Sequence, residues 1–389
     1  MSKTMKKKKI EMDIPFIGYD HGSKHDWNFD VMVGKFGNPV IGIRIKNMVE
    51  QYSADPDLYL QYHTLLNQIV ATLGEGHLLQ KLDIFSKRQY AAEPSNQFLQ
   101  QKYSEHFEGR VYKSIETVLL FTDIIEQKKK KTSYSFSEKN YKDLRDRCQK
   151  IFMLLSQYHC EPKFLREKDF EYYVGGSLSM NFVQNPVFDN IYSNNEFLRI
   201  GKQFVKTISY VDVERIELPS EIEPYSLLGG NNASSDTAVD NFSFINELED
   251  YNTIIYNQII SIPIQTQRQR DLEKKKKKHE GVANSAPSNA IVAAEIDELL
   301  HNVTVDGQLI VDAHFSIVYS ADSLDRMEET QSLIESKLFT KGINISKNAF
   351  NQLELFRCCL PGNAVELKDY DLFTTTSEAA LCFFFKESY

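Results

Sequence analysis

Apolar and polar positions follow two different periods along the first third of this chain. From Val40 to Ile45 the apolar residues recur at every second position, which is typical of a β-strand. Between Asp55 and Gly74 they recur three and four positions apart, behind an Asp-Pro pair that can cap a helix and fill its first turn. His77 to Phe85 returns to a strand pattern, and Glu116 to Ile125 adds another strand. The pattern therefore predicts a β–α–β unit with a further strand.

The middle third is expected to be more helical. Apolar residues from Tyr141 to Leu155 mark one face of a helix that ends before Pro162. Three later stretches have the pattern of strands: Ile208 to Leu218, Phe242 to Leu248 and Ile254 to Ile262. We expect the last two to form a hairpin whose turn lies at 250–252.

The last third repeats the β–α–β order. Val311, Ala313, Phe315, Ile317 and Tyr319 share one face of a strand, whereas Asp312, His314 and Ser316 share the other, so one buried side is expected. A helix capped within Ser320 to Asp322 should bury Leu324, Met327, Ile334 and Leu338 and should end at Gly342. The remaining predictions are a strand at Ile343 to Ile345, a helix near Phe350 to Leu360, and a strand at Cys382 to Phe385.

These elements predict a mixed α/β (α+β) fold made of β–α–β subdomains in series. The predicted division is a disordered basic tail at 1–14, an N-terminal α/β subdomain at 15–127, a middle helical and β-hairpin subdomain at 128–305, and a C-terminal β–α–β subdomain at 306–389. Flexible loops are expected near 227–237 and 274–290, where Gly, Asn, Ser and charged residues gather.

Composition places the chain among ordinary globular proteins. Of its 389 residues, 42% are hydrophobic and 25% are charged, and the formal net charge is −9. Five cysteines, two of them adjacent, favour a reducing cytosolic compartment over a disulfide framework. No signal peptide and no apolar run of the roughly 20 residues that span a bilayer can be found in the sequence. We therefore expect a cytoplasmic protein, peripheral to any membrane that it serves.

Lysine runs at Lys6 to Lys9, Lys128 to Lys131 and Lys274 to Lys278 are too charged to be buried. They are expected in solvated termini, loops or exposed helix ends. Clusters of this kind can also contact DNA phosphates or anionic lipid headgroups, and both contacts would weaken with salt.

The sequence contains no phosphate-binding loop. Neither G-x-x-x-x-G-K-[ST] nor G-x-G-x-x-G occurs in the chain, so no residue can be assigned to a nucleotide. Asp20, His21, His25 and Asp26 could hold zinc together with a further ligand, but a polar turn is the interpretation that we favour.

Other candidate chemistry is equally unspecific. His159-Cys160 and Cys358-Cys359 lack C-x-x-C spacing and are interpreted as helix-face or near-core residues. Gly175 to Met180 (GGSLSM) lacks the G-x-S-x-G pattern and is expected to break a helix. Carboxylates such as Glu247, Glu249 and Asp250 cannot be ranked as acids or bases from spacing. We assign no catalytic, cofactor-binding or metal-binding residue.

Several stretches, in order, resemble the N-terminal half of the TraG-type conjugative transfer ATPases, the motors of type IV secretion systems carried by conjugative transposons. They are distributed, in this order, over more than half of the chain: Gly176 to Phe182 with its neighbour Gly175, Phe197 to Pro224, Ile254 to Ile262, Asp312 to Asp322, Cys359 to Ala364, and the terminal SEAALCFFFKESY.

This resemblance implies a region that ends just before a P-loop domain, with ATP and Mg²⁺ needed only by that missing domain. It implies a non-catalytic docking and assembly role in DNA transfer at the inner membrane. The implied partners are the inner-membrane components of a type IV secretion channel and the protein's own ATPase domain. Self-association and direct DNA binding are left open.

Two alternatives of other classes are kept. A stand-alone enzyme with an unrecognised active site predicts a deep pocket with titratable side chains of shifted pKa. A nucleic-acid-binding accessory protein that uses the lysine runs predicts an affinity that falls steeply with salt.

Overall fold

The computed structural model describes residues 16–22, 27–51, 53, 55–91, 96–124, 141–184, 186–210, 219, 221–228, 237–282, 287–305, 307–345 and 351–389. The predicted tail at 1–14 and the first two lysine runs lie outside these residues. Of the strand expected at 208–218, residues 208 and 209 end a strand that begins at Gln203, and 211–218 lie outside the described residues.

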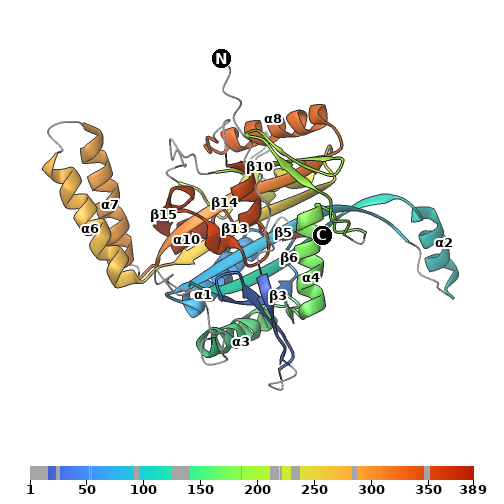
Figure 1. Cartoon of the computed structure of the whole chain (residues 1–389), viewed down its shortest axis with the longest axis horizontal. Coiled ribbons are helices and arrows are strands. Elements are labelled where there is room, and N and C mark those ends of the chain that lie inside the picture. Colours follow the sequence, from blue (N-terminus) through green and yellow to red (C-terminus); the bar gives the residue numbers. More distant parts are fainter. Residues whose placement is uncertain are drawn as a thin grey trace, which may run out of the picture.

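One large antiparallel sheet is the centre of the fold (Figure 1). Within the described residues it has twelve strands, in the order β1-β2-β3-β6-β5-β13-β14-β10-β9-β8, with β7 added on β3 and β15 added on β14. In chain order these are β1 (Phe16–Asp20), β2 (Val31–Gly34), β3 (Pro39–Ile45), β5 (His77–Gln89), β6 (Val111–Asp123), β7 (Lys163–Phe164), β8 (Ile191–Ser193), β9 (Leu198–Ile200), β10 (Gln203–Ser209), β13 (Thr253–Ile262), β14 (Ile310–Ala321) and β15 (Phe373–Thr376). The predicted mixed α/β fold class is confirmed.

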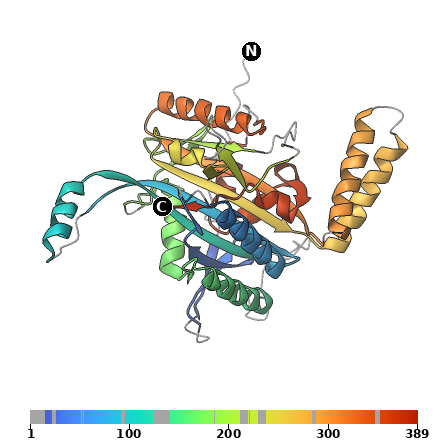
Figure 2. The ribbon, with the colours of Figure 1, turned by 180° about the vertical axis from the view of Figure 1, so that it is seen from behind.

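Helices cover both faces of the sheet (Figures 1 and 2). The buried residues of α1 (Pro56–Leu73), α3 (Lys142–Gln157), α8 (Leu324–Thr340) and α10 (Ser377–Leu381) join one apolar cluster on the first face. Those of α4 (Glu167–Ser179) and α9 (Gln352–Cys358) join a second cluster on the other face. Because the central strands are covered on both sides, His314 and Ser316 of β14 are fully buried. The prediction of one buried side for β14 is therefore wrong.

The predicted β–α–β unit is β3, α1 and β5. Asp55 caps the start of α1, because its side chain accepts a hydrogen bond from the Asp57 amide. Gly74 ends the helix with a φ of 70°, in the left-handed region that favours glycine. β6 lies between β3 and β5 and is antiparallel to both, so β3 and β5 run in the same direction. The unit is confirmed, with a strand inserted into it.

Three predicted strands are not strands. Phe242 to Leu248 instead contains α5 (Phe244–Glu247), so there is no hairpin at 250–252, and β13 pairs with β5 and β14. Residues 343–345 have no regular structure. Cys382 to Phe385 form a turn after α10, and the chain then reaches β16 (Glu387–Ser388), which pairs with β4 (Val49–Glu50). Short apolar runs have the same composition in a buried turn as in a buried strand.

The helix break predicted within Gly175 to Met180 lies at the end of this stretch: α4 continues through both glycines and ends at Ser179, followed by Met180 in a left-handed conformation. A Cβ atom on Gly176 would overlap the ring of Phe182, and one on Gly175 would lie 2.9 Å from Pro186. The glycines therefore allow the following segment to pack closely against the helix.

Strands from all three predicted subdomains lie side by side. β5 belongs to 15–127, β13 to 128–305 and β14 to 306–389, and β13 pairs with the other two. The boundaries of separately folding units stay a prediction. Of the expected loops, 229–236 lies outside the described residues between β11 (Tyr225–Leu228) and β12 (Thr237–Asp240), which pair with each other. The expected loop at 274–290 is helical at 274–281 and 287–290.

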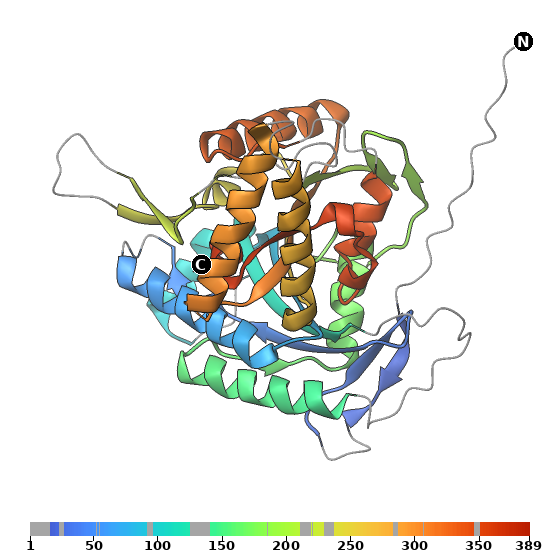
Figure 3. The same cartoon turned by 90° about the vertical axis from the view of Figure 1, so that its left-hand side faces the viewer.

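Two parts of the chain extend away from this body (Figures 1 and 3). The first is a helical hairpin of α6 (Gln265–Gly281) and α7 (Pro287–Val305), inserted between β13 and β14. The second is an arm in which the far ends of β5 and β6 carry α2 (Phe98–Phe107). Two short 3-10 helices, Ala364–Glu366 and Asp369–Asp371, connect α9 to β15.

Candidate functional site

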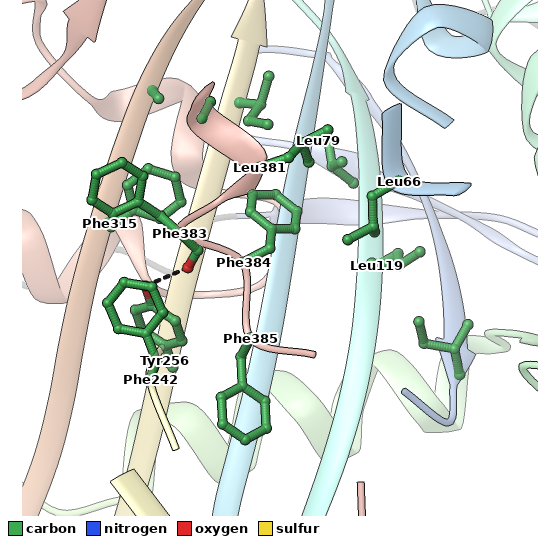
Figure 4. Packing of buried hydrophobic residues seen from close by; sticks show 14 of the residues in the cluster. Leu66, Leu79, Leu119, Phe242, Tyr256, Phe315, Leu381, Phe383, Phe384 and Phe385 are labelled. Atoms are coloured by element: carbon green, nitrogen blue, oxygen red, sulfur yellow. Dashed lines mark hydrogen bonds between the residues drawn. The ribbon is translucent and has the colours of Figure 1, made fainter. Parts of the chain in front are cut away.

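Residues 382–388, near the end of the chain, are buried in the core (Figure 4), whereas Tyr389 is exposed. Phe383, Phe384 and Phe385 are all buried. The Phe383 ring stacks on Phe315 of β14, with 4.9 Å between ring centroids. Its carbonyl oxygen accepts a hydrogen bond of 2.7 Å from the Tyr256 hydroxyl of β13. The segment from 382 to 388, here called the C-terminal segment, is thus packed on the middle strands of the sheet.

Beneath this segment lies a buried ion pair. Lys81 and Asp83, two positions apart on β5, are both fully buried and point to the same face of the sheet, where their side chains form a salt bridge. The Asp83 carboxylate also accepts hydrogen bonds from Asn47 at 3.0 Å, Thr117 at 2.6 Å and Gln258 at 2.6 Å. Four donors therefore satisfy one carboxylate away from solvent.

The same polar groups hold the backbone of the C-terminal segment. Lys81 Nζ donates to the Phe385 carbonyl at 2.9 Å, and the Phe385 amide donates to Gln258 Oε1 at 2.8 Å. Asn47 donates to the Glu387 carbonyl at 2.9 Å. A segment without regular strand pairing at 382–386 thus has its peptide groups satisfied by buried side chains.

A second set of charges comes from the segment itself. The Lys386 amide donates to the Asp240 carboxylate, and the Lys386 ammonium donates to the carbonyls of Phe384 at 2.7 Å and Leu381 at 3.1 Å. Glu387 accepts hydrogen bonds from the Tyr59 hydroxyl at 2.6 Å and the Asp240 amide at 2.9 Å. We call all these side chains, from Asn47, Tyr59, Lys81, Asp83, Thr117, Asp240, Gln258, Lys386 and Glu387, the buried polar network.

Burial shifts the protonation of this network. It raises the pKa of Asp240 to about 7, although Lys386 nearby lowers it. Burial also lowers the pKa of Lys386 and of Lys81, against the opposing attraction of Asp240 and Asp83 respectively. Because each charge is desolvated, the network costs free energy wherever a partner is missing.

The opposite face of the same strands carries a smaller polar cluster of Gln80, Asn257, His314, Ser316 and Cys359. Asn257 Nδ2 lies 3.4 Å from Cys359 Sγ and from Ser316 Oγ. Burial raises the pKa of Cys359 to about 12 and lowers that of His314 to about 4. At neutral pH the cluster therefore holds a thiol and a neutral imidazole, and His314 Nδ1 contacts the Asp371 carbonyl at 2.8 Å.

Of the four candidates for a metal site, the structure describes Asp20 and His21. Asp20 lies in β1, and the adjacent His21 has its Nδ1 atom 3.9 Å from Asp30 and 3.8 Å from Glu167. His25 and Asp26 lie outside the described residues. Within the described residues, no group of three or more His, Cys, Asp or Glu side chains is placed to hold a metal ion.

The other candidates are also dispersed. All five cysteines are buried and free of disulfides, as the core interpretation of 160, 358 and 359 predicts. Glu247 pairs with Lys337 of α8 at 2.7 Å, while Glu249 accepts a hydrogen bond from Lys87 on its carbonyl oxygen. The lysine run at 274–278 lies in α6, which confirms an exposed helical location.

Two surface cavities accompany these elements. One of about 380 Å³ lies beside Ser388 and Tyr389 and is lined by Arg44, Lys46 and Lys113, among others. The other, of about 270 Å³, lies at the base of α6 next to Arg268 and Asp271. In the described part of the chain, every helix is too short or too polar to span a bilayer.

Sequence reasoning missed the buried polar network. Lys81 and Asp83 interrupt the apolar strand His77 to Phe85, and Gln258 interrupts Ile254 to Ile262. In the sheet, Gln258 is the direct partner of Lys81. The signal that could have found the network was this pair of polar interruptions in two otherwise apolar strands, since such residues in central strands need one another.

Comparison with known families gives one finding. Residues 238–365 match the model of the CagE, TrbE, VirB family, described as a component of type IV transporter system. The match begins in β12 and ends in the 3-10 helix after α9, so it includes β13, β14 and the α6–α7 hairpin. It supports the coarser part of the resemblance, a type IV transporter component. A comparison with curated proteins gives no match.

Proposed function

We propose that this chain is the docking and assembly region of a TraG-type conjugative transfer ATPase, which places the motor at the inner-membrane channel for DNA transfer. The observation that carries the proposal is the match of residues 238–365 to a component family of type IV transporters. The matched residues supply β13 and β14, which are central strands of the sheet. The arm and the buried network are therefore attached to the type IV-like part through one continuous sheet.

In this proposal nucleotide chemistry belongs to a separate P-loop domain. The 389 residues contain no G-x-x-x-x-G-K-[ST] sequence that could cradle phosphates and position a lysine. The chain by itself is then expected to give no ATP turnover above a mock purification in a phosphate-release assay. Turnover that follows the chain through successive columns and scales with its concentration would contradict this.

The arm is the surface that we propose for docking. Ser104 is the one residue of α2 that is buried, while Leu99 is 82% exposed, Phe98 is 69% exposed and Tyr103 is also exposed. A short helix that presents large apolar side chains at the end of a two-stranded ribbon buries little against its own body. Such a surface gains free energy when a partner covers it. The partner in this proposal is an inner-membrane subunit of the type IV channel.

The test compares two exposed phenylalanines. Phe98 on the arm and Phe339 at the end of α8 are each 69% exposed, so aspartate at either position removes a similar apolar surface. We expect Phe98→Asp to lower co-purification of the channel subunits at least tenfold from cells that express the whole system, and Phe339→Asp to leave it unchanged. Equal recovery of the channel subunits with the wild type, the arm variant and Phe339→Asp would refute the arm as the docking surface.

The proposal also assigns a role to the C-terminal segment. If the motor domain follows this segment, as in the family that the chain resembles, the connection between the two is fixed in the core by Phe383 to Phe385 and by the buried polar network. A rigid connection would transmit the position of the docked body to the motor.

A further inference from the structure

The α6–α7 hairpin is attached to the body at one end. At its base, Gln265 Nε2 donates to the Ile310 carbonyl at 2.9 Å, and Arg268 pairs with Asp312 and donates to Thr374 at 2.7 Å. From there the two helices pack on each other, side by side in Figure 3, and extend away from the sheet, as Figures 1 and 2 show. The far ends of the helices, near Gly281 and Pro287, are therefore the part most distant from the body.

The outer face of α6 is cationic toward that far end. Arg270, Lys274, Lys277 and Lys278 are exposed, and at the α-helical period they fall within about 100° of the helix circumference. Lys274 also forms an exposed pair with Asp271 of the same helix at 3.3 Å. Lys276 pairs with Asp297 of α7 and so marks the side of α6 that faces the partner helix. We call the four outer residues the cationic stripe.

Apolar side chains accompany this stripe at the far end. Val282, directly after α6, is 44% exposed, and Ile291, in the first turns of α7, is 59% exposed. The stripe and these two residues combine positive charge with apolar surface on a projecting element. That combination is the one that binds the headgroup region of an anionic bilayer, where lysines meet phosphates and short apolar side chains enter the acyl boundary.

We propose that the far end of the α6–α7 hairpin binds the surface of an anionic lipid bilayer. The inference deepens the proposed function, on which it rests, by naming the membrane contact of the docked body. A lipid surface suits the hairpin better than a nucleic acid does, because the exposed side chains of Val282 and Ile291 gain nothing from a phosphate backbone but can enter the acyl boundary of a bilayer.

The first test is co-sedimentation of the whole chain with vesicles of phosphatidylglycerol and phosphatidylcholine, compared with vesicles of phosphatidylcholine alone. We expect binding to the anionic vesicles that weakens with salt. The variant Lys274→Gln, Lys277→Gln, Lys278→Gln should bind at least tenfold more weakly. A matched control, Lys142→Gln, Lys150→Gln, Lys168→Gln, removes three lysines that are also exposed on helices, but from α3 and α4, and should bind as the wild type does.

A second variant separates lipid from nucleic acid. Val282→Ser with Ile291→Ser keeps every charge and should weaken vesicle binding severalfold, because the apolar contribution is lost. Equal vesicle binding by the wild type and the stripe variant would overturn the proposal. So would binding of duplex DNA that depends on the stripe without any vesicle binding, since this would assign the stripe to nucleic acid. If either result came with normal recovery of channel subunits, the docking function would stand and the lipid contact would fail.

Discussion

At the scale of single residues, Lys81 and Asp83 form an ion pair whose two members have different numbers of hydrogen-bond partners. Asp83 accepts from four donors, whereas the ammonium of Lys81 has Asp83 and one carbonyl oxygen, that of Phe385. Removing the carboxylate takes one acceptor from each of these four donors in a dry site and leaves the Lys81 ammonium without its counter-charge. Removing the ammonium leaves the Phe385 carbonyl oxygen without this donor, while the Asp83 carboxylate keeps its three other hydrogen bonds.

We therefore predict that Asp83→Ala lowers the free energy of unfolding by about 3–5 kcal/mol. The decrease caused by Lys81→Met should be about 2 kcal/mol smaller than the decrease caused by Asp83→Ala. The lysine variant loses two fewer hydrogen bonds, and each is worth roughly 1 kcal/mol. Urea unfolding of the two variants, followed by circular dichroism, measures both values. A cost of Lys81→Met that equals or exceeds the cost of Asp83→Ala would show that the hydrogen bonds do not set the balance.

Asp240 gives the protein an unusual pH dependence. Its pKa is raised from 3.8 to about 7, chiefly by burial. Between these two pH values the folded protein keeps a proton that the unfolded chain has lost. The contribution of Asp240 to stability is therefore greatest at low pH and falls as the pH rises through this range.

This contribution can be isolated with Asp240→Asn, which cannot titrate. We expect the free energy of unfolding of the wild type to fall, relative to that of the variant, as the pH rises from about 4 to about 7. Denaturant titrations at several pH values supply the comparison. Parallel pH profiles of the two proteins would mean that the Asp240 carboxyl is not held protonated in the fold.

These residues also mark a limit of sequence reasoning. A lysine and an aspartate two positions apart on a strand indicate a shared face, but the sequence does not show that this face is dry. The burial of Asp83 depends on Asn47, Thr117 and Gln258, which lie on other segments of the chain. Contacts across such long sequence separations could not be assigned before the order of the strands was known.

At the scale of elements, prediction succeeded where several local signals agreed. For α1, the Asp55 cap, the first-turn proline, the apolar period and Gly74 all gave the same bounds. It failed where one apolar run was the whole signal, as in α5 and in Phe383 to Phe385. In both places tertiary packing decided the backbone conformation.

The glycine pair of α4 provides a test at this scale. Gly176→Ala should lower the free energy of unfolding by about 1–3 kcal/mol, since the added methyl group would overlap the Phe182 ring in a packed site. Gly281→Ala at the end of α6 is the matched control, because a Cβ there meets no atom within 4 Å. Thermal or urea unfolding of both variants decides the matter. Stabilisation by Gly176→Ala would show that helix propensity outweighs the close contact.

At the scale of the whole molecule, the class of fold was predictable but the connectivity was not. Alternating strands and helices indicated a mixed α/β protein. The sequence did not reveal that β13 would lie between β5 and β14, or that the last residues would return to pack beside β4 and β13. These contacts join residues between 51 and 338 positions apart, and no local pattern encodes them.

The two projecting parts of the molecule, the arm and the α6–α7 hairpin, are attached to the same sheet. A rigid sheet holds the apolar arm and the cationic hairpin at different places (Figure 1). In the proposed function, the arm contacts a channel subunit, the hairpin contacts lipid, and the C-terminal segment connects to the motor.

The most direct test of this account is cross-linking of the native protein in cells that carry the complete transfer system, followed by mass spectrometry. The account predicts cross-links from the arm, through Lys102 of α2, to an inner-membrane subunit of the type IV channel. Efficient cross-linking of the protein in which no channel subunit is found, at Lys102 or at any other lysine, would contradict the docking role.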